Sequence, residues 1–170
     1  MIDSFKFGYI PIGSHVARLG VPRKGLKKLP DSFCNFTALQ ELSLFSNRLQ
    51  FLPGSFGNLT KLRFLNLVQN ELTALPDSFC KLFSLKILYL NENRLNMLPT
   101  SFGELSALQR LNLRNNQLRT LPASLLQLVH LQNLWIENNP LDENAREILR
   151  VLQQQGVVID VVEYSTLARK

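Results

Sequence analysis

The chain has 170 residues, of which 45% are hydrophobic, and it carries a formal net charge of +6 at pH 7. This length and composition predict one compact domain with a sizeable core, and they exclude a disordered or membrane-embedded chain. No stretch reaches the unbroken apolar length of a membrane span, and the start of the chain lacks the basic end and apolar run of a secretory signal. We therefore expect a soluble protein.

A sequence period of 23 residues sets the organisation of the chain. The dipeptide Leu-Pro recurs at that interval, beginning at Leu29, Leu52, Leu75, Leu98 and Leu121. This regular spacing indicates a tandem array in which each unit stacks on its neighbours to bury a shared core. We expect a single domain over 1–170, with an N-terminal cap and degenerate repeat at 1–28, five repeats at 29–141, a C-terminal helix and strand at 142–163 and a tail at 164–170.

The N-terminal part is predicted to be an extended cap followed by an imperfect repeat. The stretch FKFGYIPIG alternates like a strand that shields an open core. Apolar residues then lie one period before those of the first full repeat, at Val16, Leu19, Val21 and Leu26, while Lys24 takes the position of the repeat asparagine. The segment is also basic, with Arg18, Arg23, Lys24, Lys27 and Lys28. Such a cluster can attract nucleic acid or anionic lipid, although isolated clusters are usually solvated surface.

Each of the five repeats alternates apolar and variable residues over a few positions, as LRFLNL does around Leu65 and Leu67. This is the period of a short strand with one buried face, so we expect the strands to stack in one parallel sheet. An asparagine follows each strand, where its amide can bond main-chain groups that the stack would otherwise bury unpaired. These scaffold residues form a predicted asparagine ladder: Asn47, Asn70, Asn93, Asn116 and Asn139.

The C-terminal part is predicted to be a crossover helix and a last strand. Ala145, Ile148, Leu149 and Leu152 recur at helical spacing, and Gly156 is placed to end the helix. Val157 and Ile159 lie one period after Leu134 and Ile136, which predicts that they pair with those residues in the sheet.

No residues of the chain combine into a recognisable catalytic or metal site. The motif LPDSFC occurs twice and holds both cysteines, Cys34 and Cys80, which lie two periods apart. Two strand spacings come to roughly 10 Å, which is too far for a disulfide. The same position reads Cys34, Gly57, Cys80, Gly103 and Leu126, which indicates duplication of a two-repeat unit. Because no histidine, acid or glycine-rich motif completes a site, we expect no metal, no cofactor and no enzyme activity.

The outward positions of the strands form three columns, which are expected to carry the variable, solvent-facing residues. The first runs from Glu41 to Asn133, the second from Ser43 to Trp135 and the third from Phe45 to Glu137, each at the same period. Aromatic residues beside arginines are typical of protein interaction surfaces, whereas strand propensity alone also favours aromatic and branched residues. We predict a partner-binding face formed by Phe45, Phe64, Ile87, Tyr89, Arg110, Arg114 and Trp135.

The repeats resemble the leucine-rich repeat family, whose signature L-x-x-L-x-L-x-x-N-x-L appears as LQELSLFSNRL, LRFLNLVQNEL, LKILYLNENRL, LQRLNLRNNQL and LQNLWIENNPL. The resemblance implies an α/β right-handed solenoid, or horseshoe, with a parallel sheet on its concave face and a non-catalytic role in binding another protein. The repeat length and the LPxSFGxL opening are similar to intracellular Ras-group scaffolds and to bacterial leucine-rich repeat effectors.

This resemblance leaves several expectations open. The first is a monomeric protein-binding module located in the cytoplasm, or in the host cytosol if the chain is a secreted bacterial effector. The second is binding of nucleic acid or an anionic membrane through the basic N-terminal segment, with nucleic acid the less favoured. The third is a structural role with self-association through an incompletely capped end.

Overall fold

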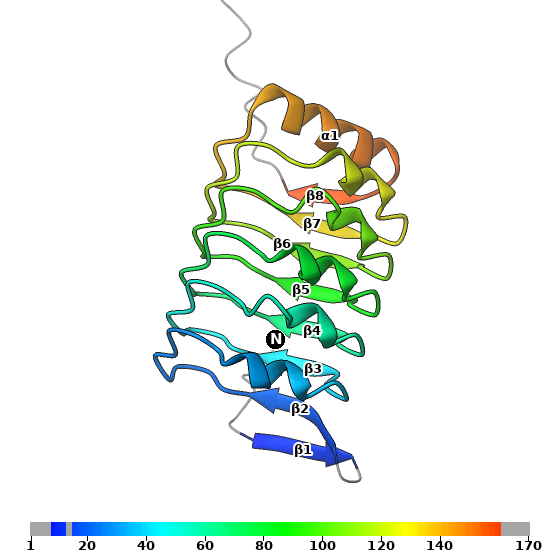
Figure 1. Ribbon diagram of the computed structural model, residues 1–170. Coiled ribbons are helices and arrows are strands. Elements are labelled where there is room, and N and C mark those ends of the chain that lie inside the picture. The colour runs from blue at the N-terminus through cyan, green and yellow to red at the C-terminus, as the bar shows by residue number, and fades with distance from the viewer. Residues whose placement is uncertain (1–7, 13–14, 161–170) are drawn as a thin grey trace, which may run out of the picture.

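The computed structural model describes residues 8–12 and 15–160. Figure 1 shows one sheet whose strands follow one another in sequence order, with short helical turns on the opposite wall. The strands are β1 (Gly8–Ile12), β2 (His15–Gly20), β3 (Glu41–Ser43), β4 (Phe64–Asn66), β5 (Ile87–Tyr89), β6 (Arg110–Asn112), β7 (Asn133–Trp135) and β8 (Val158–Asp160). The predicted repeat solenoid is therefore confirmed.

The strand register follows the sequence period. Leu19 of β2 lies beside Leu42 of β3, which lies beside Leu65 of β4, and the same step continues to β7. The strands from β2 to β8 are parallel, whereas β1 pairs antiparallel with β2. The degenerate first repeat thus supplies a true strand, and β1 covers its outer edge. Residues 5–7 and 13 of the predicted cap lie outside the described residues.

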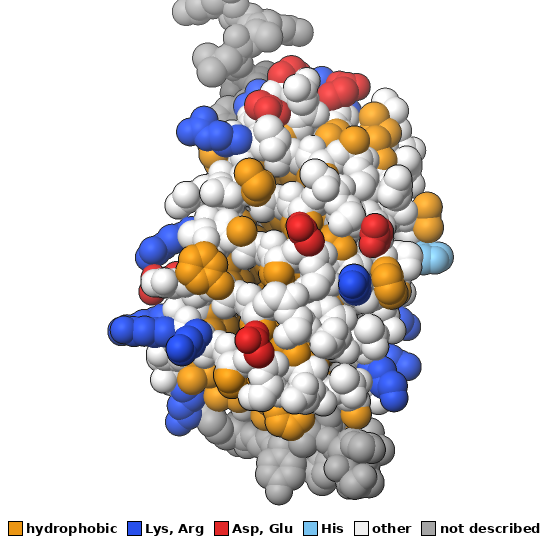
Figure 2. Space-filling model, viewed as in Figure 1, with side chains coloured by type: hydrophobic (Ala, Val, Ile, Leu, Met, Phe, Trp, Pro, Cys, Tyr) orange, Lys and Arg blue, Asp and Glu red, His pale blue; other side chains and the backbone are white. Residues whose placement is uncertain are grey.

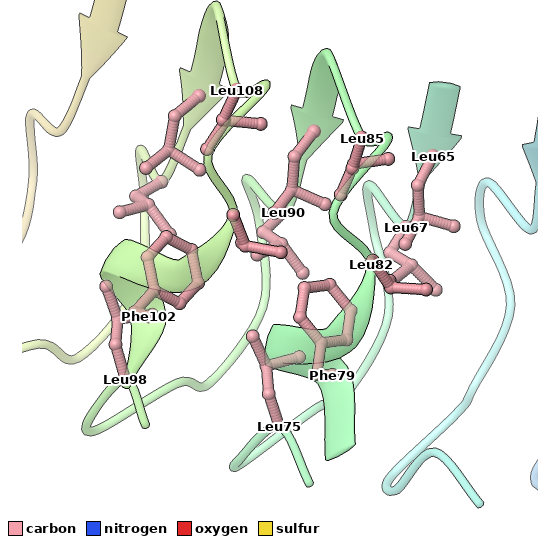
Figure 3. Close-up of a cluster of buried hydrophobic side chains, with 14 of the residues drawn as sticks. Leu65, Leu67, Leu75, Phe79, Leu82, Leu85, Leu90, Leu98, Phe102 and Leu108 are labelled. Atoms are coloured by element: carbon pink, nitrogen blue, oxygen red, sulfur yellow. The ribbon is translucent and has the colours of Figure 1, made fainter. Parts of the chain in front are cut away.

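The core fills the space between the sheet and the helical turns. The inward leucines of the strands, such as Leu65 and Leu67, are fully buried, and so are Phe56, Phe79 and Phe102 on the opposite wall. Figure 3 shows Phe79 and Phe102 pointing from the helical turns toward leucines on the strand side. The rings of Phe56 and Phe79 stack with their centroids 5.9 Å apart. Full burial of one such side chain is worth about 1.5–3 kcal/mol, so neighbouring repeats stabilise one another.

The helical turns alternate between a longer and a shorter form. The 3-10 helices η1 (Asp31–Asn35), η3 (Asp77–Lys81) and η5 (Ala123–Gln127) have five residues, whereas η2 (Phe56–Asn58) and η4 (Phe102–Glu104) have three. A Cβ atom on Gly57 would lie 2.0 Å from the carbonyl oxygen of Ser78, and Gly103 meets Ser124 in the same way. The glycine turns therefore pack directly on the turn that follows, which explains why cysteine and glycine alternate at this position.

A left-handed residue ends the strand segment of every repeat. Arg23, Ser46, Gln69, Glu92, Asn115 and Asn138 have φ between 54° and 58° and follow one another at the sequence period. Left-handed backbone costs a residue with a side chain roughly 1–2 kcal/mol. Two of the six residues are asparagine, which tolerates the conformation best, and none is glycine. The sequence analysis did not predict these turns, because the usual glycine signal is absent.

The C-terminal helix is present as predicted, but the register of the last strand differs. α1 (Glu143–Gln154) is capped at its N-terminus by Asp142, whose side chain accepts a hydrogen bond of 2.8 Å from the Ala145 N–H, and Gly156 follows the end of the helix with φ of 90°. β8 places Ile159 beside Leu134, not beside Ile136. The predicted register was therefore wrong by two residues, because the crossover through α1 is longer than a crossover through a 3-10 turn. The shift is even, so Val157 remains buried.

Candidate functional site

The solvent side of the sheet, which we call the strand face, brings the predicted binding residues into two neighbouring groups. Phe64 lies beside Ile87, and Ile87 lies beside Arg110, on adjacent strands. Tyr89 lies beside Asn112, which in turn lies beside Trp135. The first two predicted columns are therefore confirmed as neighbours. Ser43, the first residue of the second column, contributes little to the strand face, because it is only 3% exposed.

The first group is an aromatic and aliphatic cluster made of Phe64 on β4, Ile87 and Tyr89 on β5, and Phe45, which lies two residues after the end of β3. All four side chains are partly exposed. The rings of Phe64 and Tyr89 meet edge to face with centroids 5.9 Å apart, a favoured geometry for aromatic pairs. The guanidinium of Arg23 lies 5.4 Å from the centre of the Phe45 ring, within range of a cation–π interaction. These contacts fix the orientation of the rings, and part of each ring surface stays exposed and available to a partner.

The second group lies on β6 and β7 and on the residues that follow them, and it is mainly charged. Arg114 forms ion pairs with Glu137, at 3.3 Å between Nε and Oε2, and with Asp160 of β8. Arg114 is therefore held by two carboxylates, whereas Arg110 is exposed and forms no ion pair with any described residue. Trp135 lies on β7, partly exposed, beside Asp160. Asp160 and Arg23 are two residues of this face that the sequence analysis missed.

The asparagine ladder lies behind the strand ends and is continuous. The side chain of Asn93 donates to the carbonyl oxygens of Leu67 and Leu90 at 2.9 and 3.0 Å, and its own oxygen accepts from the Leu72 N–H at 3.0 Å. Equivalent bonds are made by Asn47, Asn70, Asn116 and Asn139. Asn47 also accepts from the N–H of Lys24, so the ladder ties the degenerate repeat to the first full one.

The cysteines, the possible metal ligands and the basic N-terminal residues do not come together in one site. Cys34 and Cys80 are buried free thiols, and burial raises the pKa of Cys80. Within residues 8–12 and 15–160, no group of three or more His, Cys, Asp or Glu side chains could hold a metal ion. In the basic N-terminal segment, Arg18 pairs with Glu41 at 3.0 Å, while Lys27 and Lys28 are exposed. No helix in the described part of the chain is both long and apolar enough to cross a membrane.

The chain belongs to the leucine-rich repeat family. The family model "Leucine rich repeat" matches residues 14–72, 38–95 and 83–141, in agreement with the stacked strands and the asparagine ladder. Proteins with this fold are generally protein–protein interaction modules and are typically non-catalytic.

Among solved structures, the chain is similar to a leucine-rich repeat protein of Leptospira interrogans. The two share 36% sequence identity with a TM-score of 0.81, over 85% of this chain and 37% of the other. The chain thus spans well under half the length of that protein. No curated protein sequence gives a significant match.

Proposed function

We propose that the protein is a non-catalytic recognition module that binds a partner protein on its strand face. The observation that carries the proposal is the aromatic and aliphatic cluster of Phe45, Phe64, Ile87 and Tyr89, which comes from three successive repeats and stays partly exposed. Clustered aromatic residues with arginine nearby are the usual composition of binding hot spots. Strand propensity explains single aromatic residues on a sheet, but it does not explain why Phe45, Phe64 and Tyr89 occur in three successive repeats.

The C-terminal half of the strand face offers a partner mainly charged side chains. Arg110 is available to a carboxylate of the partner, whereas Arg114 reaches a partner only as part of its cluster with Glu137 and Asp160. Trp135 adds a large, partly exposed ring at the edge of this cluster. We expect the apolar half to supply most of the affinity and the charged half to set orientation, because exposed ion pairs contribute little net energy.

The location proposed for this function is the cytoplasm, or the host cytosol if the chain belongs to a secreted bacterial effector. The two buried, unpaired thiols support a reducing compartment. Fractionation of the source cells with an antibody against the chain tests this, and recovery of the protein with a surface or extracellular fraction would contradict it.

The binding proposal is tested by affinity capture followed by measurement of the captured partner's affinity. Tyr89→Ala should weaken binding at least about 30-fold, the effect of losing one hot-spot residue. The control is Phe83→Ala, since Phe83 is 50% exposed but lies outside the strand face. Both variants should fold, and Tyr89→Ala should melt only slightly below the wild type, because it loses the edge-to-face contact with Phe64. A folded Tyr89→Ala variant that binds the partner as tightly as the wild type would contradict the proposal.

A further inference from the structure

A second surface of the solenoid, separate from the strand face, combines exposed apolar side chains with cations. It lies where the chain leaves the strands, at residues 25–28, 48–51, 71–74, 94–97 and 117–120, and we call it the exit flank. Phe51 and Met97 are among the most exposed large hydrophobic residues of the described chain, at 64% and 59%. They occupy the same repeat position two repeats apart, with the exposed Ala74 between them. The three residues form an apolar column roughly 10 Å long at the strand spacing.

Cations border this column along its length. The cationic side chains of the exit flank are Lys27, Lys28, Arg48, Arg94 and Arg119, all of them exposed. The flank has one carboxylate, Glu71, which is paired with Arg94 at 3.4 Å. Figure 2 shows Lys and Arg side chains along the left-hand edge, where the chain leaves the strands, with hydrophobic side chains between them. The basic surface ends at Arg119, because Asp142 and Glu143 occupy the next turn.

The apolar residues and the arginines occur together in the sequence. The segments NRLQF and NRLNM place Arg48 three residues before Phe51, and Arg94 three residues before Met97. The alternate repeats read NELTA and NQLRT, and neither has a large apolar residue at the position of Phe51 and Met97. Glu71 and Gln117 take the position of Arg48 and Arg94, and the second of these repeats carries its arginine, Arg119, two positions later. Isolated exposed hydrophobic residues need no explanation, but here each one comes with a cation on the same turn and recurs in the same column.

We infer that the exit flank binds the surface of an anionic lipid bilayer. Lysines and arginines near such a surface gain about 1 kcal/mol each from its negative potential. Phenylalanine and methionine side chains that protrude singly can insert between headgroups, which needs no matching pocket in the partner. An acidic protein would need shape complementarity to cover them. Nucleic acid would give Met97 no role, because a methionine side chain provides no ring on which bases stack.

The experiment is co-sedimentation of the full chain with vesicles of known composition. Vesicles of phosphatidylcholine and phosphatidylserine in equal amounts should sediment the protein at low salt, whereas pure phosphatidylcholine vesicles should not. Replacing Arg48 and Arg119 by glutamine should weaken binding about fivefold each. Phe51→Ser and Met97→Ser should weaken it at least about tenfold each, the lower end of the value of burying such a side chain. All four residues are exposed, so the variants should remain folded.

Two controls separate this inference from the proposed function. Phe83→Ser removes an exposed ring from outside the exit flank and should leave vesicle binding unchanged. Tyr89→Ala should impair capture of the protein partner and leave vesicle binding intact. The inference is overturned if anionic vesicles do not sediment the wild type, or if the double variant at Phe51 and Met97 binds them like the wild type. Binding to soluble polyglutamate that depends on the same two residues would also overturn it, in favour of an acidic protein.

Discussion

The asparagine ladder gives the most direct test of how the repeats are held together. Asn93 is 7% exposed, and its main hydrogen bonds join its own repeat, through the Leu90 carbonyl, to the preceding repeat, through Leu67 and Leu72. Asn93→Leu keeps the branched shape of the side chain and replaces the amide oxygen and nitrogen by two methyl groups. The Leu67 and Leu90 carbonyls would each keep a second donor, because Asn70 and Asn116 also bond them at 3.0 Å. The Leu72 N–H would lose its partner.

The expected cost follows from these partners. An unpaired buried N–H costs about 1–3 kcal/mol, and each lost neutral hydrogen bond to a group that keeps another partner costs about 0.5–1.5 kcal/mol at most. We therefore expect Asn93→Leu to lower the free energy of unfolding by roughly 3 kcal/mol. For a domain of this size, that corresponds to a fall in Tm of roughly 10 °C.

The measurement is thermal and urea unfolding followed by circular dichroism. The matched control is Asn96→Leu in the same repeat, since Asn96 is exposed and its side chain bonds to no other described residue. Its unfolding free energy should change by less than about 0.5 kcal/mol. If Asn93→Leu and Asn96→Leu unfold at the same urea concentration, the ladder does not stabilise the array as described.

Three further predictions concern the helical turns, the left-handed corners and the thiols. Gly57→Ala should destabilise the protein by about 3 kcal/mol, because its Cβ would overlap the Ser78 carbonyl oxygen, whereas Gly54→Ala faces open space; equal melting of the two variants would refute this. Ser46→Val should cost at least about 1–2 kcal/mol relative to Ser46→Gly, since φ is 55° there; urea unfolding in which Val equals Gly would contradict it. Burial raises the pKa of Cys80, so the folded protein keeps this thiol protonated while the unfolded chain ionises. The free energy of unfolding should therefore fall as pH rises above the ordinary thiol pKa of roughly 8.5, and Cys80→Ala should reduce that fall; an unchanged slope would contradict the reasoning.

The sequence predicted the parts of the fold that the repeat imposes. Leu42, Leu65 and Leu88 lie side by side because each repeat has the same length and the same buried positions. The period did not predict the pairing of Ile159 with Leu134, because α1 replaces the short turn and lengthens the crossover. The left-handed corners were missed for a different reason: residues such as Arg23 and Glu92 give no local signal for positive φ.

The candidate site was predictable in position but not in its internal contacts. The period places Phe64, Ile87 and Tyr89 on one face, which the register bears out. It does not show that Arg114 is paired with Asp160, because that contact depends on the register of β8. Nor does it show that Arg23 covers Phe45, since Arg23 belongs to the degenerate repeat. Contacts at the two ends of the array escape a repeat-based analysis, because the repeat is broken there.

The close approach of glycine turns to their neighbours bears on how such an array can change its length. Gly57 fits against Ser78, and Gly103 against Ser124, so turns of the shorter form are followed by turns of the longer form. Loss of one repeat from the middle would place two turns of the same form in contact. Unequal crossing-over between the two copies of LPDSFC, which lie 46 residues apart, would instead remove or add a pair. Gene length in this lineage is therefore expected to vary in steps of two repeats.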